Sequence, residues 1–142
     1  MKISAKIDYA CRSLVELALH WPNQTPLQVN EIAKRQGIPI KFLTQILINL
    51  KQLGLVQSTR GKNGGYLLAR PPEEICLHDL FANLTGETNS HWKRVNHSHK
   101  TNGMSLIWQE VEVATAKIME NINFEDICNR TRQKERNFVY EI

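Results

Sequence analysis

Residues 29–70 read VNEIAKRQGIPIKFLTQILINLKQLGLVQSTRGKNGGYLLAR, and this stretch decides the fold. Its opening segment, residues 29–36, has the spacing of a short helix that buries Ile32. Gly37 follows and supplies the left-handed backbone conformation in which helices often end. Pro39 then begins a second helix, because the first helical position needs no backbone N–H donor. Two helices joined by so short a connection predict a helix-turn-helix.

The second helix, from Pro39 to Gly54, has an apolar face and a polar face. Its apolar residues recur at helical spacing, and we expect these side chains to be buried: Phe42, Leu43, Ile46, Leu47, Leu50 and Leu53. The polar face carries Lys41, Thr44 and Gln45 near the start of the helix. Side chains at that end of such a helix reach base edges in the DNA major groove, where an amide pairs with adenine and a methyl group contacts thymine. A solvated helix face is the alternative interpretation of these three residues.

The residues after the second helix predict a two-stranded β-hairpin, or wing. Residues 55–59 and 66–69 are rich in strand formers, and the glycines between them permit the positive φ angles that a reversing chain requires. Basic residues at a hairpin tip are well placed to contact a phosphate backbone. The candidate DNA-contacting residues of the hairpin are Arg60, Lys62, Asn63 and Tyr66.

The charge of the chain is divided unevenly between its halves. Residues 1–70 carry six Lys and four Arg against three acidic residues, a net charge of +7, whereas residues 71–142 carry eight basic and eleven acidic residues, a net charge of −3. A basic half indicates a polyanionic partner. Because the helix-turn-helix and the hairpin lie in that half, we expect double-stranded DNA. The candidates for phosphate contacts are Lys2, Lys34, Arg35, Lys51, Lys62 and Arg70.

Helical periodicity also marks the chain on both sides of this region. Apolar residues spaced by three and four between Ile3 and Trp21 predict a first helix. Residues 77–85 predict a short helix, residues 87–103 a polar loop, and residues 107–122 an amphipathic helix of four or more turns. We expect the charged tail from Asn129 to Ile142 to be frayed.

The expected fold is mostly α: a winged helix-turn-helix with a two-stranded β wing and a long C-terminal dimerisation helix. We expect a DNA-binding region at residues 1–70, whose first helix also contributes to the dimer. Residues 71–128 then hold the short helix, a polar sensor-like loop and the dimerisation helix, and residues 129–142 form the tail. A long amphipathic helix on a small domain must bury its apolar stripe, and a second copy of the chain is the simplest partner. The sequence therefore predicts a homodimer.

Composition and motifs exclude several classes of protein. No stretch reaches the roughly 18–20 consecutive apolar residues of a membrane span, and the N-terminus lacks the pattern of a signal peptide, so we expect a cytoplasmic protein. The chain shows no nucleophile paired with a base, no paired carboxylates and no phosphate-binding loop, which argues against an enzyme. A winged helix that binds protein instead of DNA is the remaining alternative.

Residues 2–19, which read KISAKIDYACRSLVELAL, residues 29–70 and the long later helix together resemble a family of bacterial winged-helix transcriptional regulators, typified by IscR, NsrR, CymR and RirA. The most specific part of the match is the run STRGKNGGYLLAR. The resemblance implies a dimeric transcription factor, commonly a repressor, that responds to iron, iron–sulfur, redox or sulfur status. It also implies that Arg60 enters the DNA minor groove. Control by a partner protein, as the CymR branch suggests, is the alternative.

The cysteines of this chain depart from the family pattern. Many members hold an iron–sulfur cluster with three cysteines in the loop before the dimerisation helix, whereas residues 87–103 of this chain contain none. We expect Cys11, Cys76 and Cys128 to be reduced thiols that pack as small apolar side chains.

Histidines stand where the family has its cysteines. The loop contains His91, His97 and His99, and imidazoles bind transition metals and can ligate an iron–sulfur cluster. Asp8 or Cys11 of a second subunit would add further ligands to such a site. A solvated polar loop without a cofactor is the alternative, so the cofactor is either a cluster or metal with non-standard ligands or none.

Overall fold

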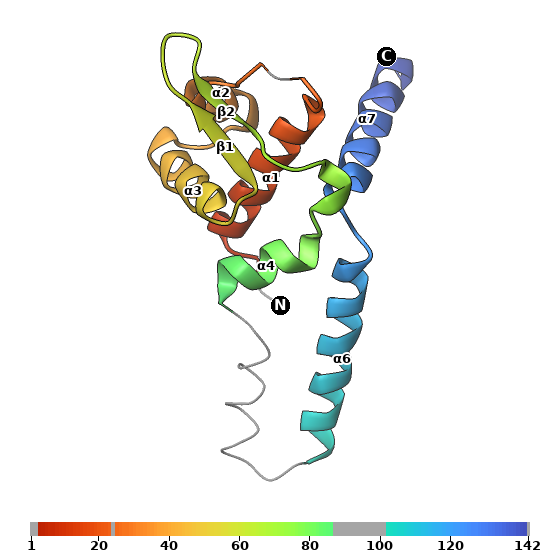
Figure 1. Ribbon diagram of the computed structural model, residues 1–142. Helices are drawn as coiled ribbons and strands as arrows, with labels where there is room; N and C mark the ends of the chain where they lie inside the picture. Colours follow the sequence, from red (N-terminus) through yellow and green to blue (C-terminus); the bar gives the residue numbers. More distant parts are fainter. Residues whose placement is uncertain (1–2, 24, 87–101, 142) are drawn as a thin grey trace. The chain divides into compact units, whose positions relative to one another are not determined.

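The computed structural model describes residues 3–23, 25–86 and 102–141, and within these ranges the chain is mostly helical (Figure 1). Its elements in chain order are α1 (Ala5–Leu19), α2 (Val29–Gln36), α3 (Ile40–Gln52), β1 (Val56–Thr59), β2 (Gly65–Leu68), the short 3-10 helix η1 (Pro72–Glu74), α4 (Leu77–Thr85), α6 (Gly103–Glu120) and α7 (Phe124–Glu141). They form two compact units: α4 and α6 make up the second, and the other elements make up the first. The predicted mostly α fold with a two-stranded antiparallel wing is confirmed.

The tight turn between α2 and α3 follows from the residues around Gly37. Gly37 has a φ of 63°, and the N–H of Ile38 donates to the carbonyl of Ala33 at 3.0 Å, which closes the end of α2. Pro39 caps α3, and its carbonyl accepts a hydrogen bond from the N–H of Leu43 at 3.0 Å. The helix-turn-helix is therefore encoded locally, by one glycine and one proline.

The core of the first unit lies where α3 packs against α1. Leu14 of α1 is fully buried, as are Leu43, Leu47 and Leu50 of α3. Ile32 of α2 is also fully buried. These side chains hold α1, α2 and α3 together through the hydrophobic effect.

The prediction that Phe42 is buried is wrong, because 59% of this residue is exposed. Around the axis of α3, Phe42 lies about 100° from Leu43, whose side chain points into the core. Phe42 therefore lies at the edge of the apolar face of α3. Leu53, at the end of the helix, is half-buried. An apolar residue beside a buried face is therefore not always part of it.

The wing is anchored on both sides. Strands β1 and β2 pair so that Ser58 lies opposite Tyr66 and Thr59 opposite Gly65. On its other side, Tyr66 exchanges two backbone hydrogen bonds of 2.8 Å with Leu27, in the segment between α1 and α2. Gly65 has a φ of 154°, and a Cβ there would lie 2.4 Å from the carbonyl oxygen of Leu27. Glycine is required at this position because the two backbones approach so closely.

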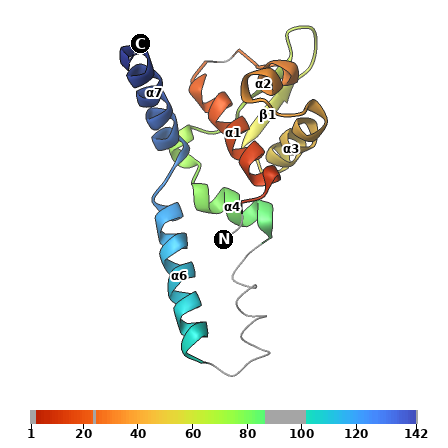
Figure 2. The same ribbon diagram turned by 180° about the vertical axis from the view of Figure 1, so that it is seen from behind.

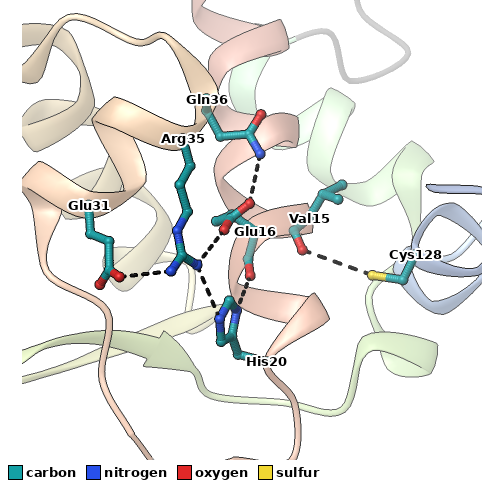
Figure 3. A network of polar contacts seen from close by, with 7 residues as sticks. All are labelled: Val15, Glu16, His20, Glu31, Arg35, Gln36 and Cys128. Atoms are coloured by element: carbon teal, nitrogen blue, oxygen red, sulfur yellow. Dashed lines mark hydrogen bonds and ion pairs between the residues drawn. The ribbon is translucent and has the colours of Figure 1, made fainter. Parts of the chain in front are cut away.

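The prediction of a frayed tail from Asn129 is wrong, because these residues continue helix α7. Phe124 and Cys128 near the start of α7 are fully buried. The N–H of Phe124 donates to the carbonyl of Ile75 at 3.0 Å, and the thiol of Cys128 lies 4.0 Å from the carbonyl oxygen of Val15 in α1 (Figure 3). The packing of its first turns against α1 gives α7 a place in the first unit.

The second unit contains α4 and α6. Gly86, with a φ of 66°, ends α4 where the sequence predicted. Helix α6 begins with a reciprocal capping box between Asn102 and Ser105, so it starts at Gly103, the last residue of the predicted loop. Residues 87–101 of that predicted loop lie outside the described residues. Not one residue of α6 is buried. No helix in the described part of the chain is long and apolar enough to cross a membrane.

Candidate DNA-binding surface

Helix α3 exposes the three polar residues predicted to contact bases. Lys41, Thr44 and Gln45 are all exposed. The hydroxyl of Thr44 donates to the carbonyl of Ile40 at 2.9 Å, and the amide nitrogen of Gln45 donates to the Oδ1 atom of Asn49 at 3.2 Å. The helix therefore presents a solvent-facing side, and the contact of these residues with bases stays a prediction.

The wing exposes its basic residues at the turn between β1 and β2, which extends past the strands (Figure 1). Arg60, Lys62 and Asn63 are exposed, whereas Tyr66 is half-buried in β2. Within the described part of the chain, neither Arg60 nor Lys62 has an ion-pair partner, so both charges are free to meet an anion. Tyr66 instead fixes the wing to the unit through its backbone hydrogen bonds.

The wing is also tied to the end of α3. The ammonium group of Lys51 donates to the hydroxyl of Ser58 in β1 at 2.7 Å. This bond joins the two elements that carry the predicted DNA contacts. Lys51 stays a candidate for a phosphate contact, because a hydrogen bond to the neutral hydroxyl of Ser58 leaves its positive charge uncompensated.

Other candidates for phosphate contacts are divided between paired and unpaired residues. Arg70 lies 3.9 Å from the carboxylate of Glu74. Lys34 is exposed and unpaired among the described residues, and Lys2 lies outside them. Lys34 is thus the α2 residue with a charge that remains available.

A polar network fixes α2 on α1 (Figure 3). Glu16 of α1 is only 7% exposed, and its two carboxylate oxygens accept hydrogen bonds from Arg35 at 3.0 Å and from Gln36 at 2.8 Å. Arg35 also pairs with Glu31 at 2.8 Å and contacts the Nε2 atom of His20 at 3.2 Å. The hydrogen bond that Arg35 donates to Glu16 raises the pKa of Arg35 above its ordinary value. The charge of Arg35 is therefore compensated within the chain.

Arg12 makes a second contact between α1 and α2. Its Nε atom lies 3.1 Å from the carboxylate of Asp8, and its guanidinium carbon lies 5.0 Å from the centre of the Tyr9 ring. A terminal nitrogen of the same side chain donates to the carbonyl of Gln36 at the end of α2. Arg12 thus bridges one turn of α1 to the last turn of α2, and Asp8 holds it there.

The described residues do not test the predicted metal or cluster site, which would need the histidines of residues 87–103 and a second subunit. The carboxylate of Asp8 is ion-paired with Arg12, and burial, followed by the charge of Asp8, raises the pKa of the Cys11 thiol to about 11. No group of three His, Cys, Asp or Glu residues in the described ranges could hold a metal ion. His91, His97 and His99 lie outside the described residues.

Comparison with models of known protein families identifies the family of this chain. The family model for Rrf2, described as an iron-dependent transcriptional regulator, matches residues 3–130. The chain belongs to the Rrf2 family. An HTH-type transcriptional regulator of Mycobacterium tuberculosis is 34% identical to this Rrf2 chain over 132 residues, which cover 90% of this chain and 81% of the relative. The prediction of a DNA-binding transcriptional regulator is confirmed.

Two solved structures share the fold of this Rrf2 chain. IscR from T. potens has a TM-score of 0.78 and 28% identity, over 92% of this chain and 88% of that one. CymR, the global cysteine regulator of B. subtilis, has a TM-score of 0.77 and 24% identity, over 92% and 98% of the two chains. The predicted resemblance to regulators typified by IscR and CymR is confirmed, and the likeness to CymR concerns the fold alone.

Sequence reasoning missed two features of the surface. One is the network around Glu16, although an acidic residue within the apolar stripe of α1 was a visible signal that this residue needs a buried partner. The other is the exposure of Ile40 and Ile48 on α3, which are 50% and 39% exposed. Both isoleucines lie outside the buried set that the helical spacing predicts.

Proposed function

We propose that two copies of this Rrf2-family chain pair through α6 and present two α3 helices and two wings to one DNA duplex, where they repress transcription. The observation that carries this proposal is the exposure of the apolar stripe of α6. Its members are between 48% and 64% exposed: Met104, Ile107, Trp108, Val111 and Ile118. Burying one such side chain stabilises a complex by about 1.5–3 kcal/mol. A stripe of this length thus supports association with a second molecule.

A second copy of α6 is the partner that the spacing favours. Ile107, Val111, Ala114 and Ile118 follow one another at steps of four, three and four residues. Steps of three and four are the pattern of helices that pack along their length, and a two-fold axis lets the same stripe serve both subunits. We call α3 and the wing of one chain a DNA-binding head. Two identical heads at a fixed separation then match a two-fold symmetric DNA site.

Within each head, α3 and the wing supply different contacts. Lys41, Thr44 and Gln45 would meet base edges in the major groove, while Arg60 would enter the minor groove. Lys62 and Lys34 would meet phosphates, which position the protein without reading sequence. Repression follows from the resemblance to regulators that are commonly repressors.

The salt dependence of DNA binding tests this function. If the dimer neutralises about 6–10 phosphates, its affinity for a selected duplex falls by roughly 10³–10⁵ between 50 and 200 mM salt. A fluorescence anisotropy titration at several salt concentrations measures this slope. An affinity that does not change with salt would contradict the proposal and favour a winged helix that binds protein.

Arg60→Ala tests the role of the wing, and we expect it to weaken specific binding by about 1–3 kcal/mol. Arg130→Ala is the matched control, because it removes the same charge from an exposed position on α7. Helix α7 lies on the side of α1 away from α3 (Figures 1 and 2). Equal affinities of the two variants for the operator would remove Arg60 from the site.

The proposed signal is iron, iron–sulfur, redox or sulfur status. Control by a partner protein, the alternative that the resemblance also suggests, is the second candidate. An absorption spectrum of anaerobically purified protein, with iron and sulfide counts, separates them. A bound cluster gives visible bands between about 300 and 500 nm from its sulfur ligands, and a spectrum without them favours the partner protein.

A further inference from the structure

The exposed side of α3 carries an apolar ridge, which we define as Ile40, Thr44 and Ile48. These residues follow one another at a spacing of four, and side chains at this spacing form one row along a helix. Ile40 is 50% exposed and Ile48 is 39% exposed. Both isoleucines are exposed, whereas Leu43, Leu47 and Leu50 of the same helix are fully buried and fill the core. The ridge is therefore a hydrocarbon surface without a partner in the first unit.

Thr44 belongs to the ridge through its methyl group. The hydroxyl of Thr44 donates its hydrogen to the carbonyl of Ile40 at 2.9 Å, so this hydrogen is not free for a base. The methyl group is what remains for an apolar partner. In the same way, the nearby Gln45 amide is engaged with Asn49 at 3.2 Å. Thr44 therefore offers its methyl group, and no hydroxyl hydrogen, to a partner.

The charge around the apolar ridge selects its partner. Helix α3 contains no acidic residue, Lys41 is exposed beside the ridge, and Arg60 and Lys62 are exposed on the neighbouring wing. An apolar surface framed by positive charge fits a partner that combines a polyanionic backbone with apolar groups. The DNA major groove is such a partner, because thymine alone among the four bases carries a 5-methyl group there.

We propose that the apolar ridge reads thymine methyl groups, so that each half-site of the operator has T·A pairs where the ridge lies. This inference rests on the proposed function, since it requires α3 to enter the major groove. Ile48 lies eight helical steps after Ile40, which is about 12 Å along the helix. This is the length of roughly three to four base-pair steps. Methyl–methyl contacts then distinguish thymine from cytosine.

Selection of duplexes from a random library provides the test sites. We expect the selected half-sites to contain T·A pairs at two or more positions within a stretch of about four base pairs. Replacing each of these thymines by uracil removes only the methyl group. We expect about a fourfold loss of affinity for each contacted methyl group. Uracil at a thymine outside the half-sites is the control and leaves the affinity unchanged.

Two substitutions of one residue identify the protein side of the contact. Thr44→Val keeps the methyl group and removes the hydroxyl, so we expect it to lose less affinity for the thymine duplex than Thr44→Ser does. Thr44→Ser keeps the hydroxyl and removes the methyl group, so the affinity falls about fourfold on the thymine duplex. Where uracil replaces the thymine that Thr44 contacts, we expect Thr44→Ser to cause no further loss of affinity. Thermal unfolding of both variants confirms that this exposed position leaves the fold intact.

The outcomes separate the apolar ridge from the proposed function. Selected sites rich in G·C pairs, a full affinity on uracil duplexes, or a larger loss in Thr44→Val than in Thr44→Ser would overturn the ridge as a thymine reader. Salt-dependent binding of two chains per duplex in the same experiments would leave the proposed function standing. A wild-type protein that selects no sequence would overturn both.

Discussion

Helices α1 and α6 have similar apolar patterns and different surroundings. Both carry apolar residues at steps of three and four over 15 and 18 residues. In α1 this stripe is buried within the chain, with Leu14 fully covered, whereas in α6 no residue is buried. The comparison teaches that periodicity predicts which face of a helix will be covered. What covers it depends on the rest of the chain or on a second molecule.

Val111→Asp in α6 should have the largest effect on DNA binding. A charge in the middle of the exposed stripe would have to be buried in the proposed pair of helices, which is unfavourable without a partner. Separate heads lose the advantage of binding together, so we expect the affinity for the operator to fall by about 10²–10⁴-fold. Anisotropy titration measures the affinity, and sedimentation velocity measures the association state.

Val113→Asp is the matched control for this prediction. Val113 is 61% exposed and lies two residues further along, so it faces away from the stripe at about 160° from Val111. We expect this variant to associate and bind DNA as the wild type does. Equal damage by the two substitutions would show that the charge acts by unfolding α6 and not by separating subunits.

Leu14→Ala removes part of the stripe that α1 buries, and we expect it to lower the free energy of unfolding by about 2–5 kcal/mol. Ile118→Ala makes the corresponding change in α6, where 64% of the residue is exposed in the single chain. The loss in Leu14→Ala should not depend on protein concentration. The loss of unfolding free energy in Ile118→Ala should increase with protein concentration, because it arises from the associated form. Urea unfolding at several protein concentrations distinguishes them, and a concentration-independent loss in both would mean that the stripe of α6 is covered within its own chain.

Glu16→Ala removes the polar centre that joins α1 to α2. Because Glu16 is nearly buried and accepts two hydrogen bonds from α2, we expect a loss of about 1–3 kcal/mol. Glu31→Ala removes an exposed partner of the same Arg35 and should cost at most about 1 kcal/mol. Urea unfolding compares them. Equal losses would contradict a special role for the buried carboxylate.

The smallest expected effect is on the pH dependence of stability, and it comes from the half-buried thiol of Cys11 in α1. Burial raises its pKa from 9.0 to about 11, so the folded state holds the proton more tightly than the unfolded chain does. This contribution to stability is complete below pH 9 and is lost as the pH rises toward about 11. At about pH 9.5 the expected loss is under about 1 kcal/mol. Cys11→Ala should lack this component, and identical pH profiles of the two proteins would contradict the shift.

The fold could be predicted wherever local residues decide it. Gly37 and Pro39 define the turn of the helix-turn-helix, Gly86 ends α4, and the glycines of the wing define its turn. Helix α7 could not be predicted, because its sequence is highly charged and, among its described side chains, Phe124 and Cys128 are the ones that are fully buried. Phe42 was misplaced because a small rotation separates the edge of an apolar arc from its centre.

The candidate site was predictable in outline and not in its internal contacts. The exposed residues of α3 and the wing follow from helical spacing and from the hairpin. That Lys51 holds Ser58 and Arg35 holds Glu16 depends on which elements meet in space, and the sequence separations of 7 and 19 residues carry no signal for it. These contacts determine which charges remain available for DNA.

The central claim is that pairing along α6 places two heads on one duplex. Native mass spectrometry of the wild-type protein with a selected operator counts the chains in each complex. The account predicts two chains per duplex for the wild type, and a single chain bound much more weakly for Val111→Asp. A single wild-type chain that binds the operator with the same affinity as the variant would contradict it.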